Sequence, residues 1–237
     1  TKELFYIPLN ETFGSKPVED KTMGRTELLE WYWTSPTYAF KINKSLANIA
    51  LIEIDNPPVN ATSRAVRQGL LDAVIAAEAD TRVSAIVIAG AGKTFVAGGD
   101  ITEFGKPPME PHLPDVMNRI EACSKPVVVA WHGTALGGGC EIGLAAHARV
   151  IAAGGQVGLP EVKLGLVPGA GGTQRLPRLV GMSAAIGLVT SGRMVSAKEA
   201  VSLGLADAIA ESDLREAAIA KAQSLIGQPI RRTGELP

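Results

Sequence analysis

The sequence contains few cysteines, almost no net charge and no long apolar run. Its two cysteines, Cys123 and Cys140, do not form a Cys-x-x-Cys pair, so neither a redox motif nor a zinc motif of that type is expected, and a reducing compartment is favoured. The 23 Lys and Arg residues are balanced by 24 Asp and Glu residues, which leaves no basic excess for a nucleic-acid partner. Apolar runs such as 83–91 are far shorter than the ~20 residues that a membrane-spanning helix needs. We therefore expect a soluble intracellular protein that binds neither nucleic acid nor a membrane.

The common nucleotide-binding loops are also missing. Gly92-Lys-Thr94 resembles the end of a phosphate-binding loop, but Val87 stands where that loop needs its first glycine. The glycines at 169–172 miss the dinucleotide pattern because Gln174 occupies the place of its third glycine. No metal-ligand spacing links the three histidines to one another or to the cysteines: His112, His132 and His147. The sequence therefore predicts no metal ion and no nicotinamide cofactor.

Strand and helix patterns alternate along the chain from residue 49 onward. Short apolar runs that end at glycine or proline predict buried strands at 49–54, 84–89 and 126–132. Ser63 is expected to cap a helix that places Val66, Leu70 and Val74 on one face. Further helices are predicted at 139–146, 172–180, 183–190, 196–203 and 212–226. This alternation indicates the α/β class.

The first 45 residues differ from the rest of the chain. They hold all but one of the Trp and Tyr residues and show no clear period of 2 or 3.6, so no element is predicted there. We divide the chain into an N-terminal extension of unassigned role (1–45), a core (46–211), and a C-terminal helix and tail (212–237) that would link to a further domain downstream.

Two glycine clusters follow strand regions and are paired with glutamates. Gly138 opens a predicted helix three residues before Glu141, and Gly99 belongs to a second cluster at 98–99. Such turns can direct backbone N–H groups toward an anion, and a helix N-terminus adds positive potential. Glu161 lies beside a proline in an apolar stretch, where burial would raise the pKa of its carboxyl group. From these residues alone, tight turns flanked by solvated glutamates explain the pattern as well as an oxyanion site does.

Four segments together resemble the enoyl-CoA hydratase/isomerase (crotonase) family. They are Asn-Pro-Pro-Val-Asn-Ala at 56–61, Phe-Val-Ala-Gly-Gly-Asp-Ile at 95–101, the glycine-rich run at 132–141, and the run at 158–177. Each is weak singly, but their order and spacing make a specific match across about residues 47–210. Glu-Phe-Gly-Lys-Pro at 103–107 and Arg-Arg-Thr at 231–233 are most similar to the hydratase portion of multifunctional β-oxidation enzymes.

The resemblance implies a fold and a set of catalytic groups. The fold would be a spiral of repeated ββα units with flanking helices. The backbone N–H groups of Gly99 and Gly138 would hold the thioester oxygen, and Glu141 and Glu161 would be the two catalytic acids. Many relatives have alanine where Gly99 stands, but a backbone donor does not depend on the side chain. The chain departs from free-standing trimeric hydratases in having only one helix and a short tail after residue 209.

The resemblance also implies a substrate and partners. Coenzyme A would bind near Asn60, Ala61, Asp100 and Ile101, largely through backbone atoms, and Arg64 is a candidate for its 3′-phosphate. Because CoA is part of the acyl-CoA substrate, no separate cofactor is expected. Relatives imply either a homotrimer or a downstream 3-hydroxyacyl-CoA dehydrogenase domain. The expected location is the cytoplasm, or the peroxisome in a eukaryote.

The implied activity is addition of water across the 2,3 double bond of enoyl-CoA thioesters in fatty-acid β-oxidation. Three alternatives stay open. One is Δ3,Δ2-enoyl-CoA isomerisation, another is a different acyl-CoA reaction such as hydrolysis or decarboxylation, and the third is a non-catalytic CoA-binding domain.

Overall fold

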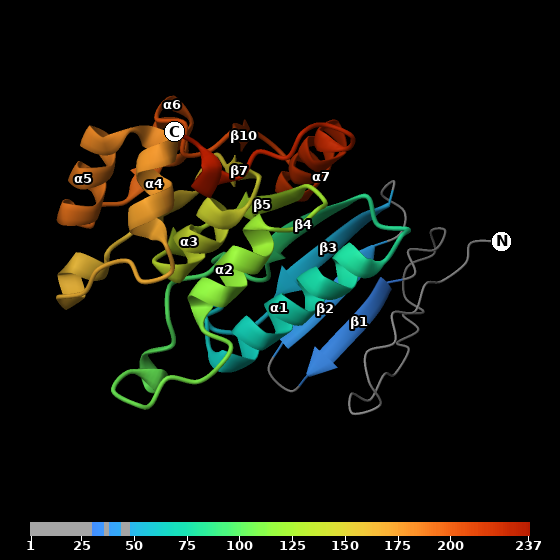
Figure 1. Ribbon diagram of the computed structural model, residues 1–237, viewed down its shortest axis with the longest axis horizontal. Coiled ribbons are helices and arrows are strands. Elements are labelled where there is room, and N and C mark those ends of the chain that lie inside the picture. The colour runs from blue at the N-terminus through green and yellow to red at the C-terminus, as the bar shows by residue number, and fades with distance from the viewer. Residues whose placement is uncertain (1–29, 36–37, 44–47) are drawn as a thin grey trace.

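The computed structural model describes residues 48–237 in full and, before them, the backbone of strands β1 (Glu30–Ser35) and β2 (Tyr38–Asn43). These two strands form an antiparallel pair, and β2 lies beside β3 (Figure 1). The sequence had predicted no element in this segment. The rest of the proposed extension, 1–29, 36–37 and 44–45, lies outside the described residues.

Five parallel strands form the main sheet, in the spatial order β10-β7-β5-β4-β3. Their bounds are Ile49–Ile54 (β3), Ala85–Gly90 (β4), Val127–Trp131 (β5), Ala148–Ala152 (β7) and Ala208–Ala210 (β10). Every residue of β3, β4 and β5 is buried, because a parallel sheet is covered on both faces. This coverage explains why the strands appear in the sequence as continuous apolar runs, and the three predicted strands are confirmed within one residue at each end.

A smaller sheet contains β6 (Thr134–Leu136), β8 (Gln156–Gly158) and β9 (Val195–Ser196). A parallel bridge joins Val96 to Ala135 of β6 and extends this sheet toward the residues after β4. Three successive units therefore place one strand in each sheet and continue into a helix. They are β4, Val96 and α2 (Leu113–Glu121); β5, β6 and α3 (Gly138–Ala145); and β7, β8 and α4 (Gly172–Val180). This is the predicted spiral of ββα units.

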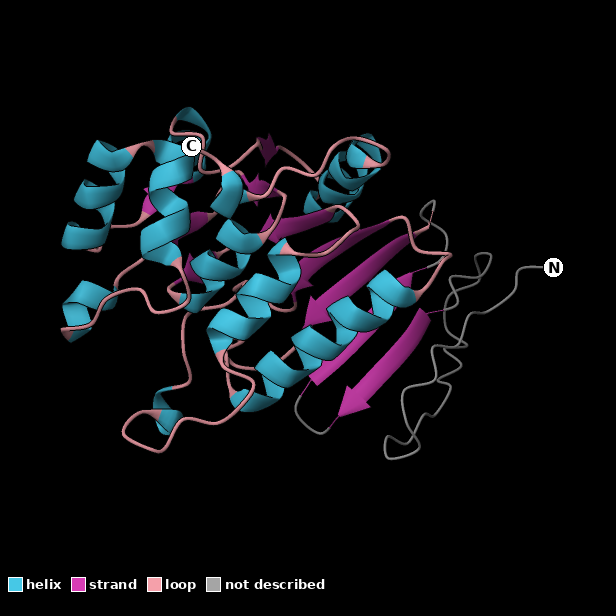
Figure 2. Cartoon of the chain, viewed as in Figure 1, coloured by secondary structure: helices cyan, strands magenta, loops and turns pink. Residues whose placement is uncertain are grey.

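Helices cover both faces of the main sheet (Figures 1 and 2). Alternate strand residues such as Ile52 and Ile88 face α1 (Arg64–Ala79), α2 and α3. Their neighbours, such as Leu51 and Val87, face α7 (Leu214–Leu225) on the other side. Because α7 packs on the same sheet as the predicted core, the C-terminal helix is part of that core's packing.

The remaining helices are α5 (Met182–Ser191) and α6 (Ala197–Ser202), with short 3₁₀ turns at η1 (Ile101–Glu103), η2 (Glu161–Leu164) and η3 (Thr233–Glu235). All the predicted helices are present, and Ser63 caps α1 through its side chain as expected. Helix α2 was not predicted from the sequence. None of the helices in the described part of the chain is both long and apolar enough to span a bilayer.

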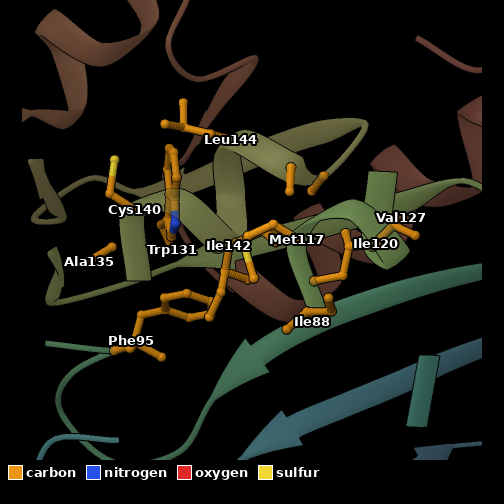
Figure 3. Packing of buried hydrophobic residues seen from close by; sticks show 14 of the residues in the cluster. Ile88, Phe95, Met117, Ile120, Val127, Trp131, Ala135, Cys140, Ile142 and Leu144 are labelled. Atoms are coloured by element: carbon orange, nitrogen blue, oxygen red, sulfur yellow. The ribbon is translucent and has the colours of Figure 1, made fainter. Parts of the chain in front are cut away.

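The helix α3 lies at the centre of the interior, and all eight of its residues are buried. Phe95, Met117, Trp131 and Ile142 pack in the same cluster (Figure 3). Side chains that surround α3 on every side fix its axis, so its first turn is held in one place. The candidate site is built on that first turn.

Candidate active site

The turn from β6 into α3 depends on glycine. Gly137 has φ 52° and ψ −120°, a conformation that residues with a Cβ rarely adopt, and α3 begins at the next residue. A Cβ on Gly139 would lie 2.2 Å from the Val96 carbonyl oxygen, so the chain passes too close there for any side chain. The three glycines thus allow α3 to start directly beside the segment that follows β4.

The second glycine turn lies against the first. The Leu136 N–H donates to the Val96 carbonyl over 3.0 Å, and the Gly98 Cα is 3.7 Å from the position that a Cβ on Gly137 would take. Among residues 48–237, no acceptor is paired with the N–H of Gly99 or of Gly138. Two neighbouring turns therefore each supply a backbone donor that is available to an anion.

Glu141 lies on the first turn of α3 and is only 3% exposed. Its Oε1 accepts hydrogen bonds from the backbone N–H of Ala170 (2.7 Å) and of Gly172 (2.9 Å). Burial raises the pKa of this carboxyl group above its usual value, although the two amides and the charge of Arg175 oppose the shift. No hydrogen bond from a described residue reaches Oε2, which leaves that oxygen for water or substrate.

Glu161 begins η2, directly after β8 and Pro160. Its Oε1 lies 3.1 Å from the Cβ position of Gly137, so its carboxyl group faces the same turn that opens α3. Its Oε2 is buried and has no hydrogen-bond partner among the described residues. Burial raises the pKa of Glu161; a hydrogen bond from its own backbone amide opposes this shift, and the charge of Glu141 adds to it.

The structure thus brings four of the predicted site residues together: Gly99, Gly138, Glu141 and Glu161. The alternative of tight turns with solvated glutamates does not describe this arrangement, because Glu141 is buried and Glu161 is half-buried. Burial raises the pKa of both carboxyl groups above that of an exposed glutamate. Such groups can exchange protons with a bound molecule, and the unpaired amides can stabilise negative charge on it.

The residues expected near CoA lie along one edge of this site. Thr62 donates its N–H to the Gly98 carbonyl over 2.9 Å, which joins the 60–62 segment to the second glycine turn. Asp100 accepts a hydrogen bond from the Thr102 N–H, and Ile101 is 76% exposed. The Ala61 carbonyl accepts a hydrogen bond from the Asn56 side chain.

The Asn60 side chain has a structural role. Its amide nitrogen donates to the carbonyls of Ala91, Thr94 and Phe95, and its Oδ1 accepts from the Asn56 N–H. Its side chain is therefore used entirely within the protein, so any contact that Asn60 makes with a substrate is through its backbone. Arg64 is exposed, and its Nε donates to the Glu110 carbonyl.

Some site residues were not found from the sequence. The amides of Ala170 and Gly172 belong to a glycine run that contributed to the family resemblance, but no contact with Glu141 was predicted for it. Phe104 was also missed: a ring carbon lies 3.3 Å from the Cβ position of Gly99. No sequence signal indicates the Phe104 contact, whereas the repeated glycines at 169–172 did signal a close approach of the backbone.

A spiral of ββα units that holds two unpaired amides beside one buried and one half-buried carboxyl group defines an enzyme of the crotonase fold. The family model described as enoyl-CoA hydratase/isomerase matches residues 44–235. The chain belongs to this family.

Known relatives agree with this assignment. The chain is 47% identical over 183 residues to a peroxisomal bifunctional enzyme of Danio rerio, a match that covers 77% of this chain and 26% of that protein. It is 43% identical over 164 residues to a probable enoyl-CoA hydratase of Bacillus subtilis, covering 66% and 64% respectively. The crystal structure of an enoyl-CoA hydratase from Bacillus anthracis superposes with a TM-score of 0.71 at 33% identity, covering 75% of this chain and 72% of that one. The chain thus spans about a quarter of the length of the bifunctional relatives.

Proposed function

We propose that this chain adds water across the 2,3 double bond of enoyl-CoA thioesters, as a hydratase of fatty-acid β-oxidation. The observation that carries the proposal is that Glu141, on the first turn of α3, and Glu161, whose carboxyl group faces the Gly137 turn that starts α3, are close enough to interact electrostatically beside two unpaired backbone amides. The names of the relatives, a bifunctional peroxisomal enzyme and a probable enoyl-CoA hydratase, support the same activity.

The N–H groups of Gly99 and Gly138 would bind the thioester oxygen. A conjugated thioester becomes electrophilic at C3 when negative charge on that oxygen is stabilised, and each donor in comparable sites contributes about 3 kcal/mol. The unpaired state of both amides supports this role, because neither has to give up a protein partner to bind the substrate.

Each of the two carboxyl groups would carry out one of the two proton transfers of hydration. Glu141 already accepts two hydrogen bonds at Oε1, an arrangement that favours its ionised form, so we assign it to the attacking water. Glu161 has a buried oxygen without a donor, which favours its protonated form, so we assign it to the proton delivered to C2. A positioned acid or base of this kind contributes about 10²- to 10⁴-fold to a rate.

The family description also includes isomerases, which supports Δ3,Δ2-enoyl-CoA isomerisation as a second candidate. Isomerisation moves a proton between two carbons and needs no activated water. The presence of two interacting carboxyl groups favours hydration as the main reaction, because hydration needs one group for the water and one for C2.

Product analysis with purified protein tests this proposal. Crotonyl-CoA should be converted to 3-hydroxybutyryl-CoA, with loss of the conjugated absorbance and no release of free CoA. Exclusive conversion of a 3-enoyl-CoA to its 2-enoyl isomer would favour the isomerase, release of thiol would favour hydrolysis, and binding without turnover would contradict catalysis.

The relatives' names support two further proposals about the whole protein. Because those relatives are bifunctional and peroxisomal, we propose a peroxisomal location and a 3-hydroxyacyl-CoA dehydrogenase domain downstream in the same polypeptide. A gene sequence that lacks such a domain would contradict the second proposal, and the location of a fluorescent fusion of the full chain would test the first.

A further inference from the structure

Arg175 occupies a buried position behind the candidate site. It lies on α4, is 6% exposed, and uses its whole guanidinium group in hydrogen bonds. Nη1 donates to the Ala170 carbonyl (3.1 Å), Nη2 to Asn118 (3.0 Å) and Glu121 (2.8 Å), and Nε to Glu121 (3.2 Å). Arg175 therefore joins the loop before α4 to the helix α2.

That loop is the one that holds Glu141. The Ala170 N–H donates to Glu141 while the Ala170 carbonyl accepts from Arg175, so one residue connects the two charged groups. Gly171 adopts φ 96°, and a Cβ there would lie 2.3 Å from Arg175 Nη1. The backbone therefore passes close to the guanidinium group. Both the positive φ and this close approach favour glycine at position 171.

Glu121 completes the arrangement from the other side. Its Oε2 accepts from Arg175, and its Oε1 accepts from the Gly234 N–H at 2.6 Å. Burial alone would raise the pKa of Glu121, but the hydrogen bonds from Arg175 and Gly234 outweigh it and hold that pKa below its usual value. Glu121 is therefore ionised at neutral pH and balances part of the Arg175 charge.

We propose that Arg175 is a positioning residue for Glu141: it fixes the loop whose amides orient the Glu141 carboxylate, and the Arg175–Glu121 pair sets the electrostatic field at that carboxylate. This inference rests on the proposed function, in which Glu141 activates water. The positive charge of Arg175 favours the ionised form of Glu141. Because the Glu121 carboxylate is paired with Arg175, we expect its negative charge to weaken that effect. The titratable groups that interact with Glu141 are Cys140 on α3, Glu161 on η2 and Arg175 on α4, and Glu121 on α2 is paired with Arg175.

Charge-removing variants at the two ends of this pair should act in opposite directions. Arg175→Gln removes a positive charge, so the pKa of Glu141 should rise and the acidic limb of the kcat–pH profile should move upward, by up to about 1 pH unit. Glu121→Gln removes the opposing negative charge, so the same limb should move downward. A purely structural disturbance would not produce shifts of opposite sign.

The kinetic constants separate positioning from binding. Arg175→Gln should lower kcat about 10-fold or more with little change in KM, because a misplaced carboxylate affects the transition state more than substrate binding. Arg175→Lys keeps the charge and should keep the acidic limb near its wild-type position. Arg178→Gln is the matched control, since Arg178 lies one turn later on α4, is exposed, and within the described part of the chain donates side-chain hydrogen bonds only to the Gln174 and Leu236 carbonyls.

A direct titration of Glu141 by ¹³C-carboxyl NMR, assigned with Glu141→Gln, distinguishes failure of this inference from failure of the proposed function. Opposite shifts in Arg175→Gln and Glu121→Gln support the inference even if wild-type protein proves not to be a hydratase. An unchanged Glu141 titration in Glu121→Gln overturns it, whatever the activity. If Arg175→Gln does not fold, the Glu141 titration is compared in Glu121→Gln and in the double variant Arg175→Gln/Glu121→Gln, which removes one charge of each sign.

Discussion

Glu161 lies directly against Gly137: its Oε1 is 3.1 Å from the position that a Cβ on Gly137 would occupy. This contact places a carboxyl group from one ββα unit on the turn that starts the helix of the preceding unit. The glycine is needed both for its backbone conformation and for the space that the carboxyl group fills.

Gly137→Ala should therefore damage stability and activity together. The positive φ at this position should cost about 1–3 kcal/mol of unfolding free energy, and displacement of Glu161 should lower kcat about 10-fold or more. Denaturant unfolding and crotonyl-CoA kinetics measure the two effects. Gly154→Ala is the control, since no atom lies within 4 Å of its Cβ position and its φ is not in the positive range; equal losses in both variants would contradict this account.

The two candidate oxyanion donors should respond differently to alanine. A Cβ on Gly99 would meet only the edge of the partly exposed Phe104 ring, at 3.3 Å, so Gly99→Ala should keep kcat within about 3-fold. A Cβ on Gly138 would lie 2.8 Å from the Leu113 side chain and 3.2 Å from the Thr62 hydroxyl group, so these side chains or the turn must move. Loss of one aligned donor costs about 10²- to 10³-fold in kcat, and Gly138→Ala should approach that range. Because alanine keeps the backbone N–H, a Gly138→Ala enzyme with wild-type kcat would contradict the expected displacement of this turn.

The pH profile should have two limbs, because the pKa values of both carboxyl groups are raised. Glu141 acts as the base and is ionised above its pKa, so the rate should fall as the pH drops through that value. Glu161 acts as the acid and is protonated below its pKa, so the rate should fall as the pH rises through that value. Measurement of kcat/KM against pH checks both signs, and a profile without an alkaline limb would contradict the assignment of Glu161.

Asn60→Ala should reduce stability more than it affects chemistry. The side chain makes four hydrogen bonds to the backbone, and their loss, together with the positive φ of 54°, should cost about 3–5 kcal/mol. Unfolding in denaturant measures this cost, with exposed Gln228→Ala as the control. A variant of unchanged stability but greatly raised KM would instead indicate that the Asn60 side chain binds CoA.

Local patterns in the sequence were sufficient for much of the fold. The strands at 49–54, 85–90 and 127–131 are buried on both faces, so their apolar runs are continuous and easily recognised. Ser63 marks the start of α1 because its side chain accepts the Val66 N–H three residues later. In contrast, β6, β8 and β9 have two or three residues each, too few for any period to show.

The site was predicted where a short motif carries it and missed where distant segments meet. Glu141 and Gly138 belong to one motif, so their proximity could be inferred from the sequence. The loop that holds Glu141 lies 29 residues away, and Arg175 contacts Glu121 across 54 residues. These residues, far apart in the sequence, meet only because α2, α3 and α4 pack against one another, and no local sequence pattern specifies that packing.

The most direct test of the account compares crotonyl-CoA hydration by wild-type protein with Glu141→Gln and Glu161→Gln, using Glu211→Gln as an exposed control. Each site variant should keep its fold and lose about 10²- to 10⁴-fold in kcat, whereas the control should match wild type. Wild-type kcat in either Glu141→Gln or Glu161→Gln would contradict the claim that these two carboxyl groups together carry out the reaction.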